Sequence, residues 1–129
     1  FNCYMILSTK ISQTILEYGK SLILALPEHH SKEEFEAVIS IVITAWNTVV
    51  MDGWNKNSKY ESDLFSAISP LPKEAQIEFK RLIRRKKEKF GLDPRAVGNY
   101  WVREENGEFI FGCEARLNVE NVSTPSITH

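Results

Sequence analysis

AVISIVITAWNTVVM, residues 37–51, is an uncharged run that decides the fold. Its apolar side chains recur at helical spacing, and Ser31 with Glu34 forms a capping-box pattern in front of it. Gly53 supplies a stop signal behind it. The many β-branched residues favour a strand individually, but a strand of this length is unusual. The run therefore predicts a central buried helix.

A membrane span is the alternative interpretation of the same run. The run falls short of the roughly 20 apolar residues that a span requires, and it contains Ser, Thr and Asn. We therefore expect a helix of a soluble domain and no membrane contact. Ile41 and Met51 lie off the main apolar stripe, which predicts that the helix is covered on more than one side, by this chain or by another subunit.

A first helix is predicted before the central one. Residues 9–26 carry apolar side chains at helical spacing, with Ser8 or Thr9 as the cap and Pro27 as the stop. The connection to the central helix is short, so the two helices should pack antiparallel as a helical hairpin.

Two more helices are predicted after the central one. Ser58 with Glu61 repeats the capping-box spacing at the start of a short helix. Pro72 suits the first turn of a basic amphipathic helix over residues 73–90.

The C-terminal third changes to the alternating period of strands. Residues 97–104 and 108–117 flank Asn106-Gly107, the strongest two-residue signal for a β-hairpin with a type I′ turn. The turn also sets the expected register, in which the partners are Val102 and Phe111, Tyr100 and Cys113, Trp101 and Gly112, Arg103 and Ile110, and Gly98 and Ala115. The sequence thus predicts an α+β fold of about four helices followed by a C-terminal antiparallel β-hairpin.

The length of the chain predicts one domain. Of its 129 residues, 43% are hydrophobic, which is enough apolar material for a single core. We expect an N-terminal extension over residues 1–8, with Met5 a candidate natural start, a domain over residues 9–117, and a polar, mobile tail over residues 118–129. The chain has only two cysteines and lacks the pattern of a signal peptide, so we expect a cytoplasmic protein.

Charge is segregated along the chain. Residues 79–95 carry a net charge of +6 and the rest of the chain −7. On a helical wheel the basic residues cover the surface around a buried stripe of Phe79, Leu82, Ile83 and Phe90. This basic face, over residues 80–89, predicts contacts to a phosphate backbone, with these candidates: Arg81, Arg84, Arg85 and Lys87.

A solvated helix face is the alternative interpretation of the basic residues, because cations near a helix C-terminus are favoured by the macrodipole. The overall acidity, and the lack of any helix-turn-helix, zinc or RNA-recognition motif, argue against a dedicated nucleic-acid binder. Asp93 and Arg95, on either side of Pro94, are interpreted as a turn with a surface ion pair.

Trp46, Asp52 and Trp54 form an aromatic and polar rim near the end of the central helix. The rim is a candidate small-molecule pocket, and core or cap packing is the alternative. The adjacent His29 and His30 lack the partners of a metal site, and no catalytic motif is present. We therefore predict no metal and no cofactor, and we favour a non-enzymatic protein over one with a catalytic pocket at this rim.

Surplus apolar surface supports the leading hypothesis, a non-enzymatic protein-association domain that forms a homodimer. Ile41 and Met51 lie behind the central helix, and Trp101 and Ile110 lie behind the hairpin. Apolar side chains gathered in this way are typical of an interface.

The segments WNTVVMDG (residues 46–53) and RRKKEKFGLDPR (residues 84–95), with the closing hairpin, resemble a group of small bacterial proteins of no assigned reaction or cofactor. The resemblance covers residues 9–117 and gives no named residue a role. It implies a bacterial, cytoplasmic protein, and small proteins of this kind often travel on mobile genetic elements.

Overall fold

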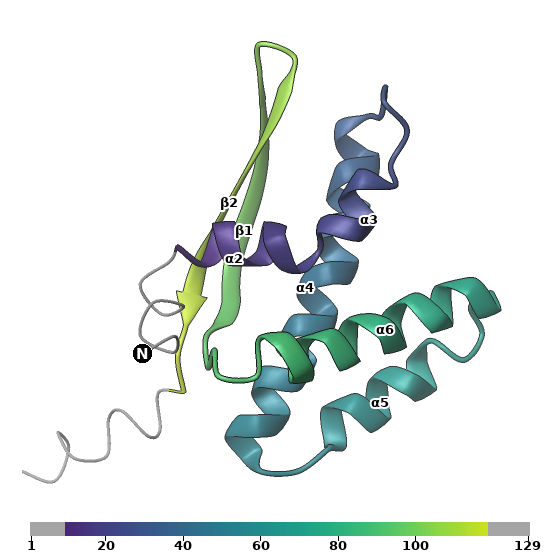
Figure 1. The fold of residues 1–129 in the computed structure, drawn as a ribbon, viewed down its shortest axis with the longest axis vertical. Helices are drawn as coiled ribbons and strands as arrows, with labels where there is room; N and C mark the ends of the chain where they lie inside the picture. The colour runs from purple at the N-terminus through teal and green to yellow at the C-terminus, as the bar shows by residue number, and fades with distance from the viewer. Residues whose placement is uncertain (1–9, 119–129) are drawn as a thin grey trace, which may run out of the picture.

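The computed structural model describes residues 10–118, in which five helices precede a two-stranded antiparallel sheet (Figure 1). The predicted α+β class is confirmed. The expected extension over residues 1–8, and all but the first residue of the expected tail, lie outside the described residues. The elements are α2 (Ile11–Tyr18), α3 (Lys20–Leu24), α4 (Lys32–Asn55), α5 (Lys59–Ala67), α6 (Lys73–Lys89), β1 (Ala96–Glu105) and β2 (Glu108–Arg116).

The central helix α4 contacts α2, α3, α5, α6 and β1. Its capping box forms as predicted, because the Glu34 amide donates to Ser31 Oγ at 3.1 Å and the Ser31 amide donates to Glu34 Oε1 at 2.8 Å. Gly53 is not the stop. The helix continues to Asn55, and Lys56 takes the left-handed conformation, with φ of 55°. The Asn57 amide then donates to the Asp52 carbonyl, as in a Schellman motif, so backbone bonding and not a glycine ends the helix.

By length and composition α4 also qualifies as a helix that could cross a membrane, with a mean hydropathy of 1.4 over its best window. The core helix of a folded domain passes the same test. In this fold α4 supplies buried side chains to the shared core, among them Ile39, Val42 and Trp46.

The predicted first helix is broken at Gly19 into α2 and α3. α3 runs beside the first half of α4, whereas α2 turns away and lies across the base of the hairpin (Figure 1). The break brings the backbone against α4, because a Cβ on Gly19 would lie 2.7 Å from Val42 Cγ2. Only α3 therefore forms the antiparallel pair that was expected of the whole segment. Close backbone contact, invisible to helical periodicity, is the reason for the difference.

The hairpin has the predicted turn and most of the predicted register. Asn106 and Gly107 both have positive φ, 54° and 80°, as a type I′ turn requires. The predicted partnership of Gly98 with Ala115 is wrong, because a register shift between Val97 and Tyr100 pairs Val97 with Ala115. The pairs that are confirmed are Val102 with Phe111, Tyr100 with Cys113, Trp101 with Gly112, and Arg103 with Ile110.

The strand β1 is fastened to α4 at its first residues. Asn47 on α4 donates from Nδ2 to the Val97 carbonyl at 2.9 Å, and the Val97 amide donates to Asn47 Oδ1 at 2.7 Å. The side chain amide thus bonds both backbone groups of a strand residue. A two-stranded sheet is marginal alone in water, so this attachment helps to hold the hairpin on the helices.

Three aromatic rings form the centre of the core. The Tyr18 and Trp46 ring centroids lie 5.1 Å apart, and the Phe90 ring lies 5.6 Å from Tyr18 and 5.7 Å from Trp46, all edge to face. Such pairs add stability beyond the area they bury. The Tyr18 hydroxyl donates to the Leu82 carbonyl at 2.6 Å, which joins α2 to α6 inside the core.

Two glycine substitutions should act in opposite directions. Gly53→Ala should raise the free energy of unfolding by up to about 1 kcal/mol, because Gly53 lies within α4 and no atom beyond the adjacent backbone of that helix lies within 4 Å of an added Cβ. Gly19→Ala should lower it, because the new methyl collides with Val42. Urea denaturation measures both. The double substitution Gly19→Ala/Val42→Ala should lower the free energy of unfolding by less than the sum of the two single substitutions. If the two effects are fully additive, the close-contact explanation is contradicted.

Candidate functional site

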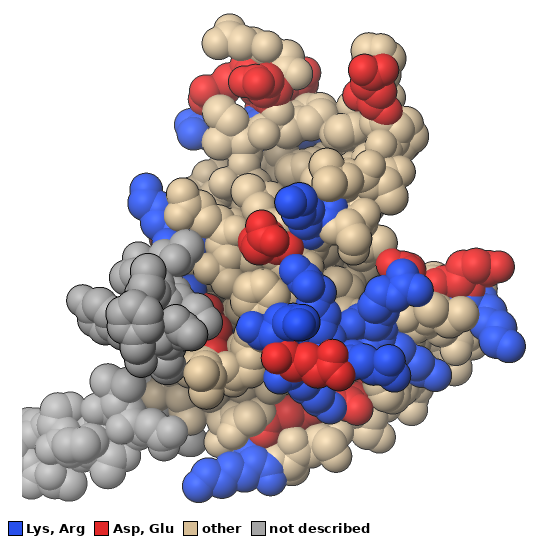
Figure 2. Space-filling view, in the orientation of Figure 1, with Lys and Arg blue, Asp and Glu red and all other residues tan. Residues whose placement is uncertain are grey.

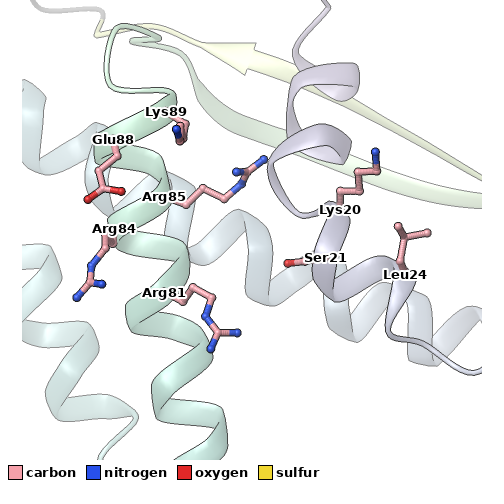
Figure 3. Close-up of a pocket in the computed structure, with 8 residues that line it drawn as sticks. All are labelled: Lys20, Ser21, Leu24, Arg81, Arg84, Arg85, Glu88 and Lys89. Atoms are coloured by element: carbon pink, nitrogen blue, oxygen red, sulfur yellow. The ribbon is translucent and has the colours of Figure 1, made fainter.

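An open groove of about 530 Å³ lies between α3 and α6 (Figure 3). Five of its side chains are cationic and one is acidic, and in Figure 3 Arg81 and Arg85 extend from α6 into the space between the two helices. We call it the α3–α6 groove. It is lined by Lys20, Ser21, Leu24, Arg81, Arg84, Arg85, Glu88 and Lys89.

The space-filling view shows how local this charge is. Lys and Arg side chains gather over the part of the surface that α6 occupies, with acidic side chains among them, and further acidic side chains lie at the upper edge of the view (Figure 2). The hairpin turn there carries Glu104, Glu105 and Glu108 beside Asn106 and Gly107. A chain with a net charge of −1 thus presents one strongly positive region.

Arg85 fixes one wall of the groove. Its Nε donates to the Tyr18 carbonyl at 3.0 Å and its Nη2 donates to the Glu17 carbonyl at 3.2 Å. These carbonyls belong to the C-terminal end of α2, where unpaired acceptors and the macrodipole favour a cation. The guanidinium therefore holds the α2–α3 junction against α6.

The other cations of the groove are less constrained. Arg81 pairs with Glu78 one turn earlier, and both side chains are exposed or half-buried. Within residues 10–118, the side chains of Lys20, Arg84 and Lys89 make no hydrogen bond or ion pair. Their charged groups are therefore available to a ligand that reaches the groove.

Three of the four residues expected to contact phosphates, Arg81, Arg84 and Arg85, line this groove. Lys87 does not, because it points to α5 and its Nζ lies 2.7 Å from Glu61 Oε1. Sequence reasoning missed Lys20 on α3. Nothing in the local pattern around residue 20 indicates that this helix faces residues 81–89.

Lys86 is buried beneath the basic surface, contrary to the expectation that every basic residue of the helix lies on its exposed face. It is 1% exposed, and its Nζ lies 4.3 Å from the Trp46 ring centroid. The Nζ donates to the Phe90 carbonyl at 2.6 Å and to the Asp93 carbonyl at 3.0 Å. Burial lowers the pKa of Lys86 from 10.5 to about 8, against the opposing effect of Asp93.

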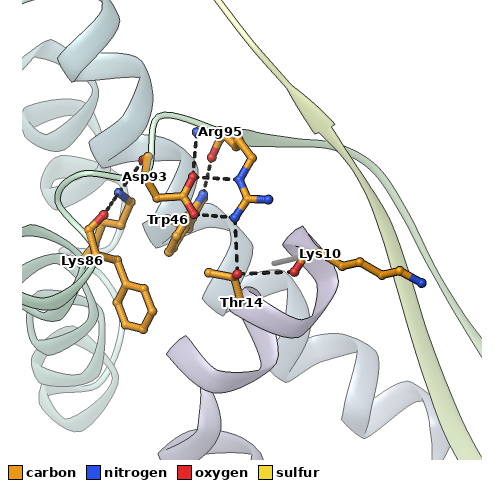
Figure 4. Close-up of polar contacts among 7 residues, drawn as sticks. Lys10, Thr14, Trp46, Lys86, Asp93 and Arg95 are labelled. Atoms are coloured by element: carbon orange, nitrogen blue, oxygen red, sulfur yellow. Dashed lines mark hydrogen bonds and ion pairs between the residues drawn. The ribbon is translucent and has the colours of Figure 1, made fainter. Parts of the chain in front are cut away.

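The predicted surface ion pair of Asp93 and Arg95 is wrong in its location, because Asp93 is buried and the Arg95 side chain is only 11% exposed. Figure 4 shows the contacts of the pair. Arg95 Nη2 lies 2.6 Å from Asp93 Oδ2, and Arg95 Nε lies 2.9 Å from Asp93 Oδ1. The Arg95 guanidinium also donates to Thr14 Oγ1, and the Arg95 carbonyl accepts a hydrogen bond from Trp46 Nε1 at 2.6 Å. The hydrogen bond to Asp93 raises the pKa of Arg95. The pair joins α2, α4 and the connection between α6 and β1.

The three residues of the expected small-molecule pocket do not line one cavity. Trp46 is fully buried in the core. Asp52 is a helix cap, because its two carboxylate oxygens accept from the amides of Tyr60 and Glu61 at 2.8 and 3.0 Å. This carboxylate takes the place of the Ser58 cap predicted for α5, and Ser58 makes no side-chain cap. Trp54 alone borders a groove, of about 400 Å³, and it donates to the Pro94 carbonyl.

The four residues expected at a dimer interface fall into two groups. Ile41 and Met51 are half-buried, and Ile41 packs against the core. Trp101 and Ile110 are more open, 43% and 37% exposed. Trp101 covers Gly112 so closely that a Cβ there would lie 2.6 Å from the indole ring. Dimerisation itself stays a prediction.

The stability of the protein should rise with pH between about pH 8 and pH 10 through Lys86. In this range the unfolded chain, with the ordinary pKa of 10.5, binds a proton that the folded chain has begun to release, so the free energy of unfolding increases with pH. Below about pH 8 the cost of burying the charge is fully present. Urea denaturation across this range should show the rise in the wild type and a smaller rise in Lys86→Met. An identical pH dependence in both proteins would contradict the assignment.

No family model matches the chain, and neither a curated protein nor a solved structure matches it. Among residues 10–118, no group of three or more His, Cys, Asp or Glu side chains could hold a metal ion. The two segments that carry the sequence resemblance lie on the second half of α4 and on α6 with its following loop, and these elements meet around Trp46, Lys86 and Asp93. Function therefore has to be inferred from the residues of the molecule itself.

Proposed function

We propose that this protein associates with nucleic acid by binding its phosphate backbone in the α3–α6 groove. The observation that carries the proposal is that five cationic side chains, from two separate helices, line one open groove with a single carboxylate. Arginine binds phosphate oxygens through two parallel hydrogen bonds, and lysine binds them as a point charge. Both residue types are present in the groove.

The alternative of a merely solvated helix face accounts for only part of this arrangement. The macrodipole favours cations within the last turn of a helix. Arg81 and Arg84 lie further back on α6, and Lys20 belongs to α3. A binding role that needs positive charge in the groove would account for Arg81, Arg84 and Lys20 together.

Salt should weaken the binding of labelled nucleic acid steeply, because each phosphate contact releases a counterion. About four contacts would give a slope near −3 to −4 in a plot of log affinity against log salt, between about 50 and 200 mM salt. Fluorescence anisotropy at low salt measures the affinity. Arg84→Gln should weaken binding several-fold and make the slope less steep by about 1.

Lys73→Gln is the matched control for Arg84→Gln. It removes one positive charge from the same helix, at an exposed position that does not line the groove. It should change the affinity much less than Arg84→Gln. Equal effects of the two substitutions, or no binding at low salt, would contradict the proposal.

Self-association of two copies through the outer face of the hairpin is a second candidate function. The observation that favours it is that exposed Trp101 and Ile110 lie on the same face of the hairpin, on ladder pairs two positions apart. Sedimentation velocity at micromolar concentration should show a dimer in the wild type and a monomer in Ile110→Lys. A strict monomer in both would contradict this candidate and leave the groove unaffected.

A further inference from the structure

We infer that the α3–α6 groove takes the backbone of double-stranded nucleic acid in preference to a single strand, without reading its bases. The inference rests on the proposed function and names the partner of the same site. It depends on two features of the residues that line the groove: five of them are cationic, and none of them is aromatic.

The lining offers no aromatic ring on which a base could stack. Its one large apolar side chain is Leu24, which is 72% exposed, and its lining residues include no aromatic ring. The aromatic side chains on and near α6 are occupied elsewhere. Phe79 is buried, Phe90 packs on Tyr18 and Trp46, and Phe65 lies under Lys80 at 5.5 Å from the ring centroid.

Single-strand binding depends on stacking as well as on charge. Proteins that bind single strands combine a basic groove with aromatic side chains, because stacking offsets the ordering of a flexible strand. In this groove a bound single strand would be ordered mainly by phosphate contacts. Its bases would find no aromatic side chain to stack on, so they would add less affinity than in a dedicated single-strand binder.

A duplex needs no such contribution. The backbone of a duplex is already ordered, and it carries one negative charge per about 1.7 Å of its axis. Each Lys or Arg side chain that contacts a duplex phosphate therefore displaces more condensed counterions than it would on a single strand. The groove carries cations on both of its walls, Lys20 on α3 and Arg81, Arg84 and Lys89 on α6. A ridge of phosphates lying between the walls can meet both sets.

The walls are also held in place relative to each other. Arg85 bonds the carbonyls of Tyr18 and Glu17 from α6, and Tyr18 bonds the Leu82 carbonyl in return. A groove fixed in this way matches a ligand of fixed shape. Contacts to phosphates alone carry no sequence information, so duplexes of different sequence should bind with equal affinity.

The test compares labelled duplex and single-stranded DNA of equal length and uses a gain of function. Wild type should bind the duplex on the order of tenfold more tightly. Leu24→Trp places an aromatic ring in the groove and should raise single-strand affinity on the order of tenfold, with little change for the duplex. Leu92→Trp is the matched control, because Leu92 is 65% exposed and does not line the groove.

Three outcomes would overturn the inference, and they are distinguishable from one another. Equal wild-type affinity for both ligands, weakened several-fold in Arg84→Gln, would reject the duplex preference and leave the proposed function standing. A folded Leu24→Trp protein, verified by circular dichroism, with unchanged single-strand affinity would reject the stacking argument. Binding of neither ligand at low salt would reject the inference together with the proposed function.

Discussion

The buried ion pair of Asp93 and Arg95 is the interaction on which the rest of this structure depends. Removing two charges from water is costly, and the cost is recovered only where geometry is good and the remaining hydrogen-bonding groups are satisfied. Both conditions hold here, because the guanidinium bonds both carboxylate oxygens, and the described chain has no buried side-chain nitrogen or oxygen without a partner. The pair lies where α2, α4 and the start of β1 meet, so its geometry requires those elements to stay together.

The same junction determines which way α6 faces. Lys86 is held against Trp46 and bonds the backbone at Phe90 and Asp93, so its position on α6 is turned inward together with Leu82 and Ile83. Because a helix turns about 100° per residue, fixing these positions leaves the other side of the helix facing α3 and solvent. The cations of the α3–α6 groove lie on that side. The core thus orients the groove, and Arg85 connects the two by bonding the end of α2.

The features that could be predicted from the sequence are those that a short stretch of residues determines by itself. The capping box of Ser31 and the Asn106-Gly107 turn, with the four predicted ladder pairs nearest the turn, follow from local spacing, and the structure confirms them. The errors occur where a distant contact overrides the local signal. Gly19 breaks a helix because Val42 lies against it, and Asp52 caps α5 across a loop. Of the groove, the α6 side was predictable as a basic face, whereas the contribution of α3 depends on a tertiary contact that no periodicity encodes.

The distribution of charge bears on how such a groove would work. A protein with a net charge of −1 is not drawn to nucleic acid as a whole, because long-range attraction follows the overall field. Attraction begins only within about a Debye length of the groove, roughly 8 Å at physiological salt. The carboxylates at the hairpin turn repel a phosphate backbone that approaches from that end. Segregated charge therefore favours one orientation of approach, with α3 and α6 toward the ligand and the hairpin turn away from it. The affinity for nucleic acid would then depend on the few cations in the groove. Substitution of one groove cation should therefore weaken binding, whereas substitution of an equal charge elsewhere on the surface should weaken it much less.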